Sequence, residues 1–358
     1  MRKRNSKESV GVVGLDLGDH WTSWCRCSPG GEVESEGRVR TTRAGLSKQF
    51  PGEPRCRVAL ETGSQSLWVA RHLRSLGHEV LVLHARSLRM ITQSRRKTDR
   101  WDARVLAQLA ATTKPEVLHT VDVMDEQIQA DRAVLLARDL LVRCRTQQIS
   151  HVRGVCKAWG TPLTAATSKS FPLKVRERLP AALRVALMPI LDSILQLTEA
   201  IAAYDRQLEE LAETRYAESR QLTQVPGVGT LTSLAYLWTI RTPERFSRSR
   251  QVGAYVGLAP AARRSGQRDV QMHITKQGST ILRRLLVQCA HHILARPGCD
   301  GQLRRFGLRL AATGGARGKK RAVVAVARKL SILLLHLWKT GQAYDPWGGQ
   351  ACPSELAA

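Results

Sequence analysis

The sequence lacks the cysteine patterns of common metal and redox proteins. None of its 8 cysteines forms a C-x-x-C pair, the usual element of structural zinc sites and redox-active dithiols. Two cysteines and two histidines near the C-terminus fit no standard zinc spacing: Cys289, His291, His292 and Cys299. Nothing indicates a secretory context, so reduced thiols in a cytoplasmic protein are expected.

Long uninterrupted hydrophobic runs are also absent. The basic N-terminus is followed by a short apolar run that contains Asp16, which argues against a signal peptide. The apolar segment 322–338 is interrupted by Arg328 and Lys329, a pattern that predicts a buried helix rather than a membrane span. We therefore expect no membrane partner.

Acidic residues are scarce, with 30 Asp and Glu against 56 Lys and Arg and a net charge of +26. A charge this large attracts polyanions. Nucleic acid is the first candidate, because phosphate neutralisation supplies most non-specific affinity. An acidic membrane surface and a ribosomal-type structural role rank below it. Residues 241–330 hold 20 Lys and Arg against three acids, which places the main basic surface in the C-terminal part.

The 358 residues, 43 % of them hydrophobic, suggest two domains and a connector. Three strands, a strand–helix–strand unit and a closing helix give the order of an RNase H-like α/β domain. The strands are expected at 10–17, 21–27, 31–35, 56–61 and 79–83, and the helices at 65–76 and 101–112.

The middle of the chain predicts an antiparallel helical hairpin, made by 126–158 and 182–215 and broken at 160–180. A heptad seam follows its second helix: Ile194, Leu197, Ile201, Tyr204, Leu208 and Leu211. The seam can pack on its own partner helix or on another protomer. A second, mainly helical domain and a Gly/Pro-rich tail, expected to be disordered, follow. The predicted boundaries are 1–118, 119–216, 217–340 and 341–358.

Four acids occur where separate elements would bring them together. Asp16 ends the first predicted strand in GLDLG, Glu61 ends the fourth in ALETG, and Asp99 and Asp102 open a helix in KTDRWDARVLA. Each alone is typical of a solvated carboxylate or a first-turn acid favoured by the helix dipole. Together they can converge, and converging carboxylates need cations. Two Mg²⁺ ions about 3.5–4 Å apart would suit phosphoryl transfer.

The surroundings of the last two acids are basic, as a site beside a nucleic-acid backbone requires. The cations there are Arg86, Arg89, Arg95, Arg96, Lys97, Arg100 and Arg104. A second D-x-x-D, Asp122 and Asp125, lies in a less defined segment and is treated as a decoy, and Asp19 is a possible substitute.

Two motifs in the C-terminal part indicate phosphate contacts. PGVG, with Gly227 and Gly229, resembles the turn of a helix-hairpin-helix element, whose free amides can hold a phosphate, although an ordinary interhelical turn has the same composition. Ser265 is expected in a loop beside arginines that could hold a scissile phosphate, whereas composition alone favours a plain turn. Further candidate contacts are Arg263, Arg264, Arg268, Lys276, Arg283 and Arg284.

These blocks together resemble insertion-sequence transposases of the one-ten family. The four acids lie in motifs similar to that family's DEDD domain, and VPGVG (225–229), RFSRSRQVGAYVGLAPAARRSG (245–266) and ITKQGSTILRRLL (274–286) are similar to its C-terminal transposase domain. The resemblance spans about 10–115 and 219–295. The first motif departs from it at Asp19-His20, where relatives often carry a small residue and a lysine.

The resemblance implies a RuvC-like domain with Mg²⁺ held by Asp16, Glu61, Asp99 and Asp102, and Ser265 as the nucleophile that bonds to a DNA phosphate. It also implies double-stranded DNA partners, namely element ends and target, and a structured non-coding guide RNA. A homo-oligomer, dimer to tetramer, would combine the two sites across protomers. The location would be the bacterial cytoplasm, on the nucleoid when active.

Four other functions compete with this interpretation. A junction nuclease would cut with the four acids and never use a serine. A proofreading exonuclease needs D-x-E in the first motif, where Asp16 is followed by Gly18. A non-enzymatic nucleic-acid-binding protein would need none of the acids. An actin-like ATPase would need a second Gly-rich phosphate loop, and none is obvious.

Overall fold

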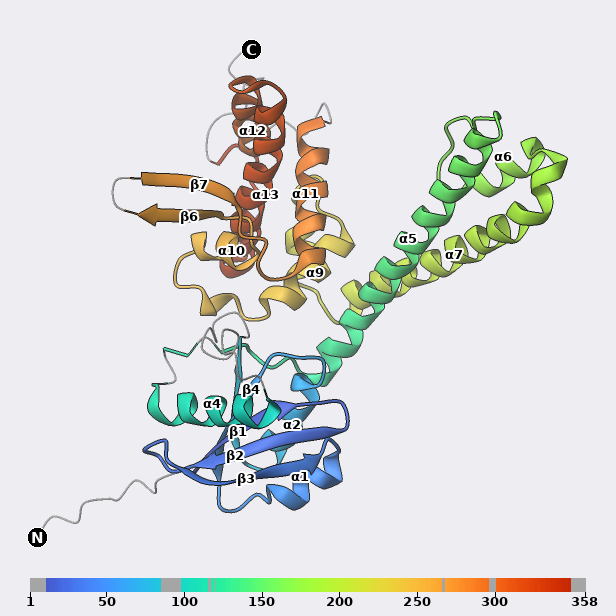
Figure 1. The fold of residues 1–358 in the computed structure, drawn as a ribbon. Helices are drawn as coiled ribbons and strands as arrows, with labels where there is room; N and C mark the ends of the chain where they lie inside the picture. Colours follow the sequence, from blue (N-terminus) through green and yellow to red (C-terminus); the bar gives the residue numbers. More distant parts are fainter. Residues whose placement is uncertain are drawn as a thin grey trace, which may run out of the picture. The chain divides into compact units, whose positions relative to one another are not determined.

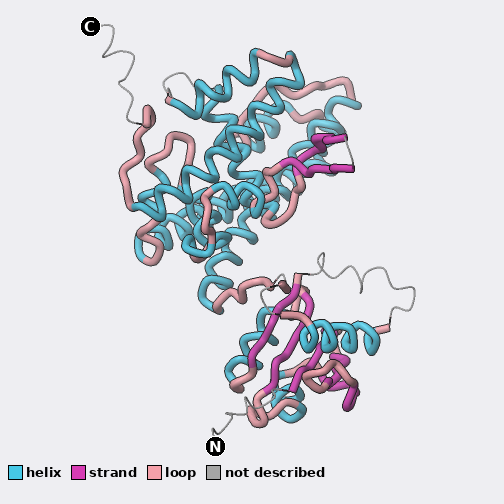
Figure 2. The backbone as a smooth tube through the Cα atoms, turned by 90° about the vertical axis from the view of Figure 1, so that its left-hand side faces the viewer, coloured by secondary structure: helices cyan, strands magenta, loops and turns pink. Residues whose placement is uncertain are grey.

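The computed structural model describes residues 11–84, 98–114, 117–118, 120–265, 268–295 and 301–348, without the side chains of 262–271 and 316. The chain divides into two units, Met1–Gln127 and Ile128–Ala358. Figures 1 and 2 show the elements of the two units from two directions.

The first unit is built on a five-stranded mixed sheet with the order β3-β2-β1-β4-β5. Its antiparallel strands are β1 (Gly11–Leu17), β2 (Trp21–Cys27) and β3 (Val33–Arg40). The strands β4 (Cys56–Glu61) and β5 (Glu79–Leu83) continue the sheet in parallel with β1. The mixed α/β character expected from the strand pattern is confirmed, although β3 begins later and runs further than predicted.

Helices cover both faces of this sheet. One face packs α1 (Arg43–Gln49) and α2 (Ser66–Ser75) against alternate residues of the central strands, such as Leu15 and Leu60. The other face carries α4 (Asp99–Thr112) (Figure 1). Leu106 of this helix belongs to the same buried cluster as Val12 of β1. Strand residues alternate between the two faces, so β1 contributes to both cores. Helix α1 was not predicted, because its seven residues include one buried side chain, Leu46.

The second unit begins with the predicted helical hairpin, made by α5 (Glu126–Ala158) and α7 (Ala181–Thr214). Its break contains a short helix that was not predicted, α6 (Phe171–Arg178). Ile194, Ile201 and Leu208 of the predicted seam are buried. Polar contacts join the two long helices: Arg138 with Asp205, Arg145 with Thr198 and Gln148 with Ser193.

One helix of the described part, α7, is long and apolar enough to cross a membrane by length and composition. Only 22 % of the qualifying window is buried, and a single such helix is weak support for a span. The polar contacts between α7 and α5 are those expected of a helical hairpin.

The rest of the second unit is a helical body around one core. Its members are α8 (Ser219–Thr223), α9 (Thr230–Ile240), the 3₁₀ turn η2 (Pro243–Arg245), α10 (Arg250–Tyr255), α11 (Thr280–Ala295), α12 (Gln302–Ala312) and α13 (Gly315–Thr340). Trp238 and Tyr236 lie at the centre, where the Tyr236 hydroxyl donates to the Ser331 carbonyl at 2.7 Å. The segment 322–338 lies in α13 and is largely buried, as predicted.

A two-stranded hairpin interrupts this helical body, where the sequence analysis expected helices and a loop. β6 (Pro260–Ser265) pairs antiparallel with β7 (Arg268–Ile274), and the hairpin projects from the helices (Figures 1 and 2). PAARRS has neither the alternation nor the β-branched residues that indicate a strand locally. PAARRS becomes a strand because it pairs with RDVQMHI.

The start of the tail is packed, which corrects the expectation that 341–358 is disordered. Gln302 donates from its backbone to the Pro346 carbonyl at 2.9 Å and from its side chain to the Trp347 carbonyl at 2.6 Å. The Tyr344 backbone donates to Gln224 at 2.8 Å. These bonds hold 342–347 to the helical body; residues 349–358 lie outside the described part.

Candidate active site

Two of the predicted acids lie at one end of the sheet, on neighbouring strands. Leu15 of β1 pairs with Leu60 of β4, so the next residues, Asp16 and Glu61, are also neighbours. Adjacent strands point equivalent residues to the same face. That face is the one covered by α4, because Val12, four residues before Asp16, and Ala59, two residues before Glu61, pack against it.

Helix α4 brings the other two acids to the same place. It begins at Asp99, where the Thr98 side chain accepts a hydrogen bond from the Trp101 amide at 3.2 Å. The helix lies directly on β1, since a Cβ on Gly14 would be 2.1 Å from the Ala103 carbonyl oxygen. Asp102 is the residue before Ala103 and therefore lies next to the contact with β1.

An ion-pair cluster holds the start of α4 over the sheet edge. Glu36 of β3 accepts from Arg100 and, at 3.1 Å, from Arg104. The hydrogen bond from Arg100 is the main cause of a lowered Glu36 pKa. Both arginines were expected to hold nucleic acid, but Glu36 engages them. Glu36 was not among the predicted site residues, because only the β2–β3 register places it on this face.

The electrostatics of Asp16 couple it to the other three acids. Its pKa is raised from 3.8 to about 6, first by burial and then by the charges of Asp99, Asp102 and Glu61. Like charges gathered in a half-buried place oppose one another's ionisation. A compensating cation would relieve both effects.

The four carboxylates suit a hard cation by their chemistry, since Mg²⁺ prefers oxygen ligands. Within the described ranges, no three His, Cys, Asp or Glu side chains already lie close enough to hold a metal ion. The four acids are thus electrostatic neighbours and not a ready-made cage. The same result gives no support to a zinc site at Cys289, whose thiol lies 3.4 Å from the Thr232 hydroxyl.

Replacing Gly14 by Ala tests the close approach of α4 to β1. The new Cβ would lie 2.1 Å from the Ala103 carbonyl oxygen and 2.4 Å from the Ala107 amide nitrogen. We expect Gly14→Ala to lower the free energy of unfolding by about 1–3 kcal/mol in urea titrations, because backbone cannot yield as a side chain does. Gly11→Ala on the same strand, with its nearest contact at 3.7 Å, is the control. Equal effects would contradict the tight packing.

A pH-dependent stability is expected from Asp16. The pKa of Asp16 is higher in the folded protein than the ordinary 3.8. The stability that its protonated carboxyl contributes is therefore fully present below pH 3.8 and is lost as the pH rises through about 6. After discounting for partial exposure, we expect Asp16→Asn to stabilise the metal-free protein at pH 8 by about 1–2 kcal/mol, with little gain at pH 4. Urea unfolding in EDTA measures both, with exposed Asp19→Asn as control. A gain that does not change with pH would be inconsistent with the coupling.

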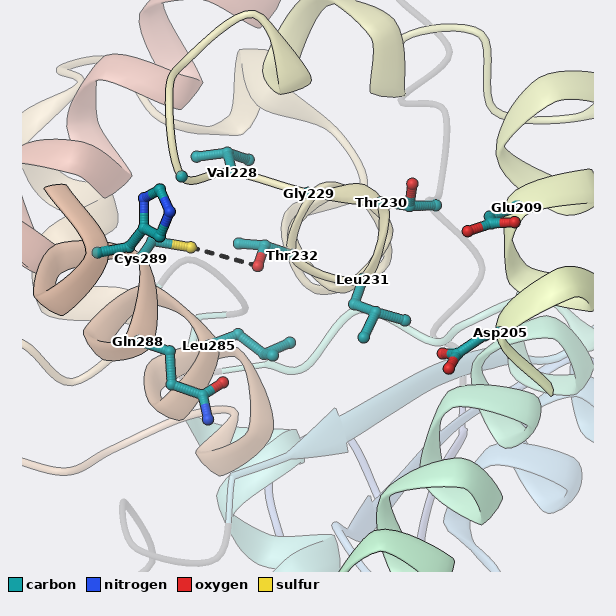
Figure 3. A pocket seen from close by; sticks show the side chains of 12 residues that line it. Asp205, Glu209, Val228, Gly229, Thr230, Leu231, Thr232, Leu285, Gln288 and Cys289 are labelled. Carbon is teal, nitrogen blue, oxygen red and sulfur yellow. Dashed lines mark hydrogen bonds between the residues drawn. The ribbon is translucent and has the colours of Figure 1, made fainter. Parts of the chain in front are cut away.

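In the second unit, the PGVG turn joins α8 to α9 and borders a cavity of about 640 Å³. Gly227 has φ +89°, a conformation that favours glycine, and Gly229 is the N-cap of α9. Asp205 and Glu209 of α7 line the cavity opposite Gln288 and Cys289 of α11 (Figure 3). Asp205 is paired with Arg138, but the Glu209 carboxylate opposes an anion, so phosphate contact through Gly227 and Gly229 stays a prediction.

Ser265 is the last residue of β6 and pairs with Arg268, the first of β7. This corrects the predicted loop: the serine is the last residue of a strand. Arg264 pairs with Asp269 and Arg263 with Val270 in the same ladder. The side chains of this hairpin tip lie outside the described residues, as do the predicted contacts Arg95, Arg96 and Lys97.

Three further predicted contacts lie near the base of the hairpin. Lys276 is exposed and has φ +55°, unusual for a residue with a side chain. Arg283 donates to the carbonyls of Val256 at 3.1 Å and Gln277 at 2.7 Å, so it braces this loop. Arg284 pairs with Asp139 of α5. The two arginines therefore have structural partners, and Lys276 is the best placed of the three to contact a ligand.

Comparisons with known proteins agree along the chain. One family model, described as a transposase, matches residues 13–158, and a second, described as the transposase IS116/IS110/IS902 family, matches 219–304. A probable family 20 transposase of Pseudomonas aeruginosa is 30% identical over 266 residues, 72% of this chain and 77% of its own. The transposase for insertion sequence element IS1328 of Yersinia enterocolitica is 29% identical over 293 residues (80% and 85%). That for IS1111A of Coxiella burnetii is 26% identical over 354 residues (96% and 93%).

Proposed function

This chain belongs to the IS116/IS110/IS902 family of transposases and is a DNA recombination enzyme, and from that premise we propose that it cleaves and rejoins DNA with a Mg²⁺-dependent carboxylate site and a serine nucleophile. The observation that carries the carboxylate half is the coupling of four acids from β1, β4 and α4: burial, and then the charges of Asp99, Asp102 and Glu61, raise the pKa of Asp16 to about 6.

Asp16, Glu61, Asp99 and Asp102 would hold the metal in a RuvC-like domain. Bound Mg²⁺ would neutralise these carboxylates and stabilise negative charge on the attacking and leaving oxygens of a phosphodiester. Asp16 is half-buried on β1 next to β4, and its carboxylate is electrostatically coupled to the other three. Glu36 maintains that arrangement by holding Arg100 and Arg104.

Ser265 would supply the nucleophile. Its Oγ bonds to phosphorus, the bond from phosphorus to the leaving deoxyribose oxygen breaks, and that oxygen takes up a proton while the serine proton passes to solvent. Attack on the phosphoserine by a deoxyribose hydroxyl of another strand reverses the step and rejoins DNA without ATP. The position of Ser265 at the end of β6 favours this role, because a strand terminus can present a hydroxyl to bound DNA.

The remaining partners are proposed on the family alone: element-end and target DNA, a structured non-coding guide RNA, and a homo-oligomer of two to four chains. The test incubates the full chain, its element's non-coding RNA and element-end DNA with Mg²⁺ or with EDTA. The proposal expects nicked DNA attached to protein on a denaturing gel with Mg²⁺ only. Attachment in EDTA, or none in Mg²⁺ with RNA present, would refute it.

A further inference from the structure

An exposed aromatic side chain lies beside two arginines, at the start of β2 in the sheet of the first unit. Trp21 of β2 is 40% exposed. Arg40 of β3, its partner in the strand register, places its guanidinium carbon 4.2 Å from the Trp21 ring centroid, and Arg38 follows at 5.8 Å. Because Trp21 is not part of the buried core, packing does not explain a large aromatic side chain at this position.

The strand register places this cluster beside the carboxylates. Ser23 of β2 pairs with Asp16 on one side and with Arg38 on the other. Residues paired across neighbouring strands share a face, so Asp16, Ser23 and Arg38 form one row, and Trp21 and Arg40 form the next. With strands about 4.8 Å apart, the backbone of Arg38 is about 10 Å from that of Asp16.

The two arginines are available to a ligand. Among the described residues, no carboxylate forms a salt bridge with Arg38 or Arg40, whereas Glu36 on the same strand engages Arg100 and Arg104. Arg38 and Arg40 are both exposed. A guanidinium stacked on an indole keeps its N–H edge directed outward, which is the edge that binds phosphate.

We propose that Trp21, Arg38 and Arg40 form a platform for single-stranded DNA next to the carboxylates. An unpaired base stacks on the Trp21–Arg40 pair, and the adjoining phosphates bind the two arginines. Aromatic stacking combined with basic groups is how proteins hold single strands without sequence preference. A duplex keeps its bases stacked on one another, so the exposed indole favours a strand that has opened. The platform rests on the proposed function, because it would hold the nucleotides flanking the cut.

The test measures binding of the full chain in EDTA to a fluorescent oligothymidylate of about 12 nucleotides, within the site sizes of single-strand binders. Trp21→Ala is expected to weaken binding about tenfold, while Trp21→Phe keeps most of the affinity. The Arg38→Gln, Arg40→Gln double variant is expected to reduce the slope of log Kd against log salt by about 1.4, for two phosphate contacts on a single strand.

Matched controls separate the platform from overall charge and folding. Trp159→Ala removes a tryptophan that is 56% exposed, just beyond the end of α5, and the Arg184→Gln, Arg206→Gln double variant removes two exposed charges from α7; both are expected to bind as wild type. Photo-crosslinking of an iodouracil-containing DNA strand, read by mass spectrometry, is expected to modify Trp21. This second readout does not depend on a variant's stability.

Three results would overturn the platform. Equal affinities for Trp21→Ala and Trp159→Ala, or crosslinks that never reach Trp21, would overturn the platform. So would an effect confined to an oligouridylate of the same length, because the ligand would then be RNA. Binding is measured without metal, so it does not depend on cleavage. If Trp21 is needed to bind single-stranded DNA but the chain never cleaves DNA, the proposed chemistry is wrong and the platform stands.

Discussion

Replacing Ser265 by Ala is expected to abolish the covalent protein–DNA product and to lower strand exchange by about 10⁴-fold or more, because the reaction loses the atom that bonds to phosphorus. Ser265 ends β6 and is paired through the backbone with Arg268, so alanine keeps the ladder bonds of the hairpin. DNA affinity is therefore expected to stay within about threefold of wild type, since a lost neutral hydroxyl removes at most one weak contact. The measurement is a single-turnover assay with end-labelled DNA.

The same variant distinguishes the junction-nuclease alternative, in which water replaces the serine. A nuclease that uses only the four acids would keep cutting in Ser265→Ala and would never attach to DNA. Ser247→Ala is the matched control, since Ser247 is an exposed serine of the same domain whose hydroxyl contacts Gln251 at 3.4 Å. Full strand exchange by Ser265→Ala would eliminate the serine mechanism.

Replacing Asp16 by Asn is expected to lower the rate of strand cleavage by about a thousandfold or more, because the loss of a metal-binding carboxylate removes several kcal/mol of transition-state stabilisation. The protein is expected to stay folded, since an asparagine side chain fills the same space and carries no charge among Asp99, Asp102 and Glu61. DNA binding in EDTA is expected to be unchanged or slightly tighter. A loss of cleavage that tracks loss of DNA binding would instead indicate a damaged surface.

Asp122→Asn is the control for that experiment. Asp122 belongs to the second D-x-x-D, and the carboxylates that raise the Asp16 pKa do not include it. The Asp122→Asn variant is expected to cleave DNA at the wild-type rate. A nucleic-acid-binding protein without enzymatic activity would show no difference between Asp16→Asn and Asp122→Asn in any assay.

Local patterns predicted the sheet and the acids because each had a strong signal in sequence. VGVVGLDL and CRVALE are apolar, β-rich and bounded by turn residues, and each contains an acid at or next to its end. Parallel neighbours end at the same edge of a sheet, so Asp16 and Glu61 had to meet once β1 and β4 paired. The N-cap Thr98 likewise set the start of α4, two residues earlier than predicted.

Long-range pairing determined what the sequence did not indicate. The strand character of PAARRS depends on β7, and the role of Glu36 depends on which face of β3 it shares with α4. The Trp21–Arg40 stack joins residues of two strands whose register no local pattern specifies. The packing of 342–347 depends on Gln302 and Gln224, far away in the chain. Tertiary contacts override local propensity at all four places.

Titration with Mn²⁺, a paramagnetic substitute for Mg²⁺, is the most direct test of the acid cluster as the metal site. With element-end DNA bound, the wild-type chain is expected to take up roughly two ions, and Asp16→Asn, Glu61→Gln, Asp99→Asn and Asp102→Asn are each expected to lose at least one of them. The Asp122→Asn, Asp125→Asn double variant is expected to bind as wild type. Unchanged Mn²⁺ uptake in all four single variants would contradict the assignment of these carboxylates.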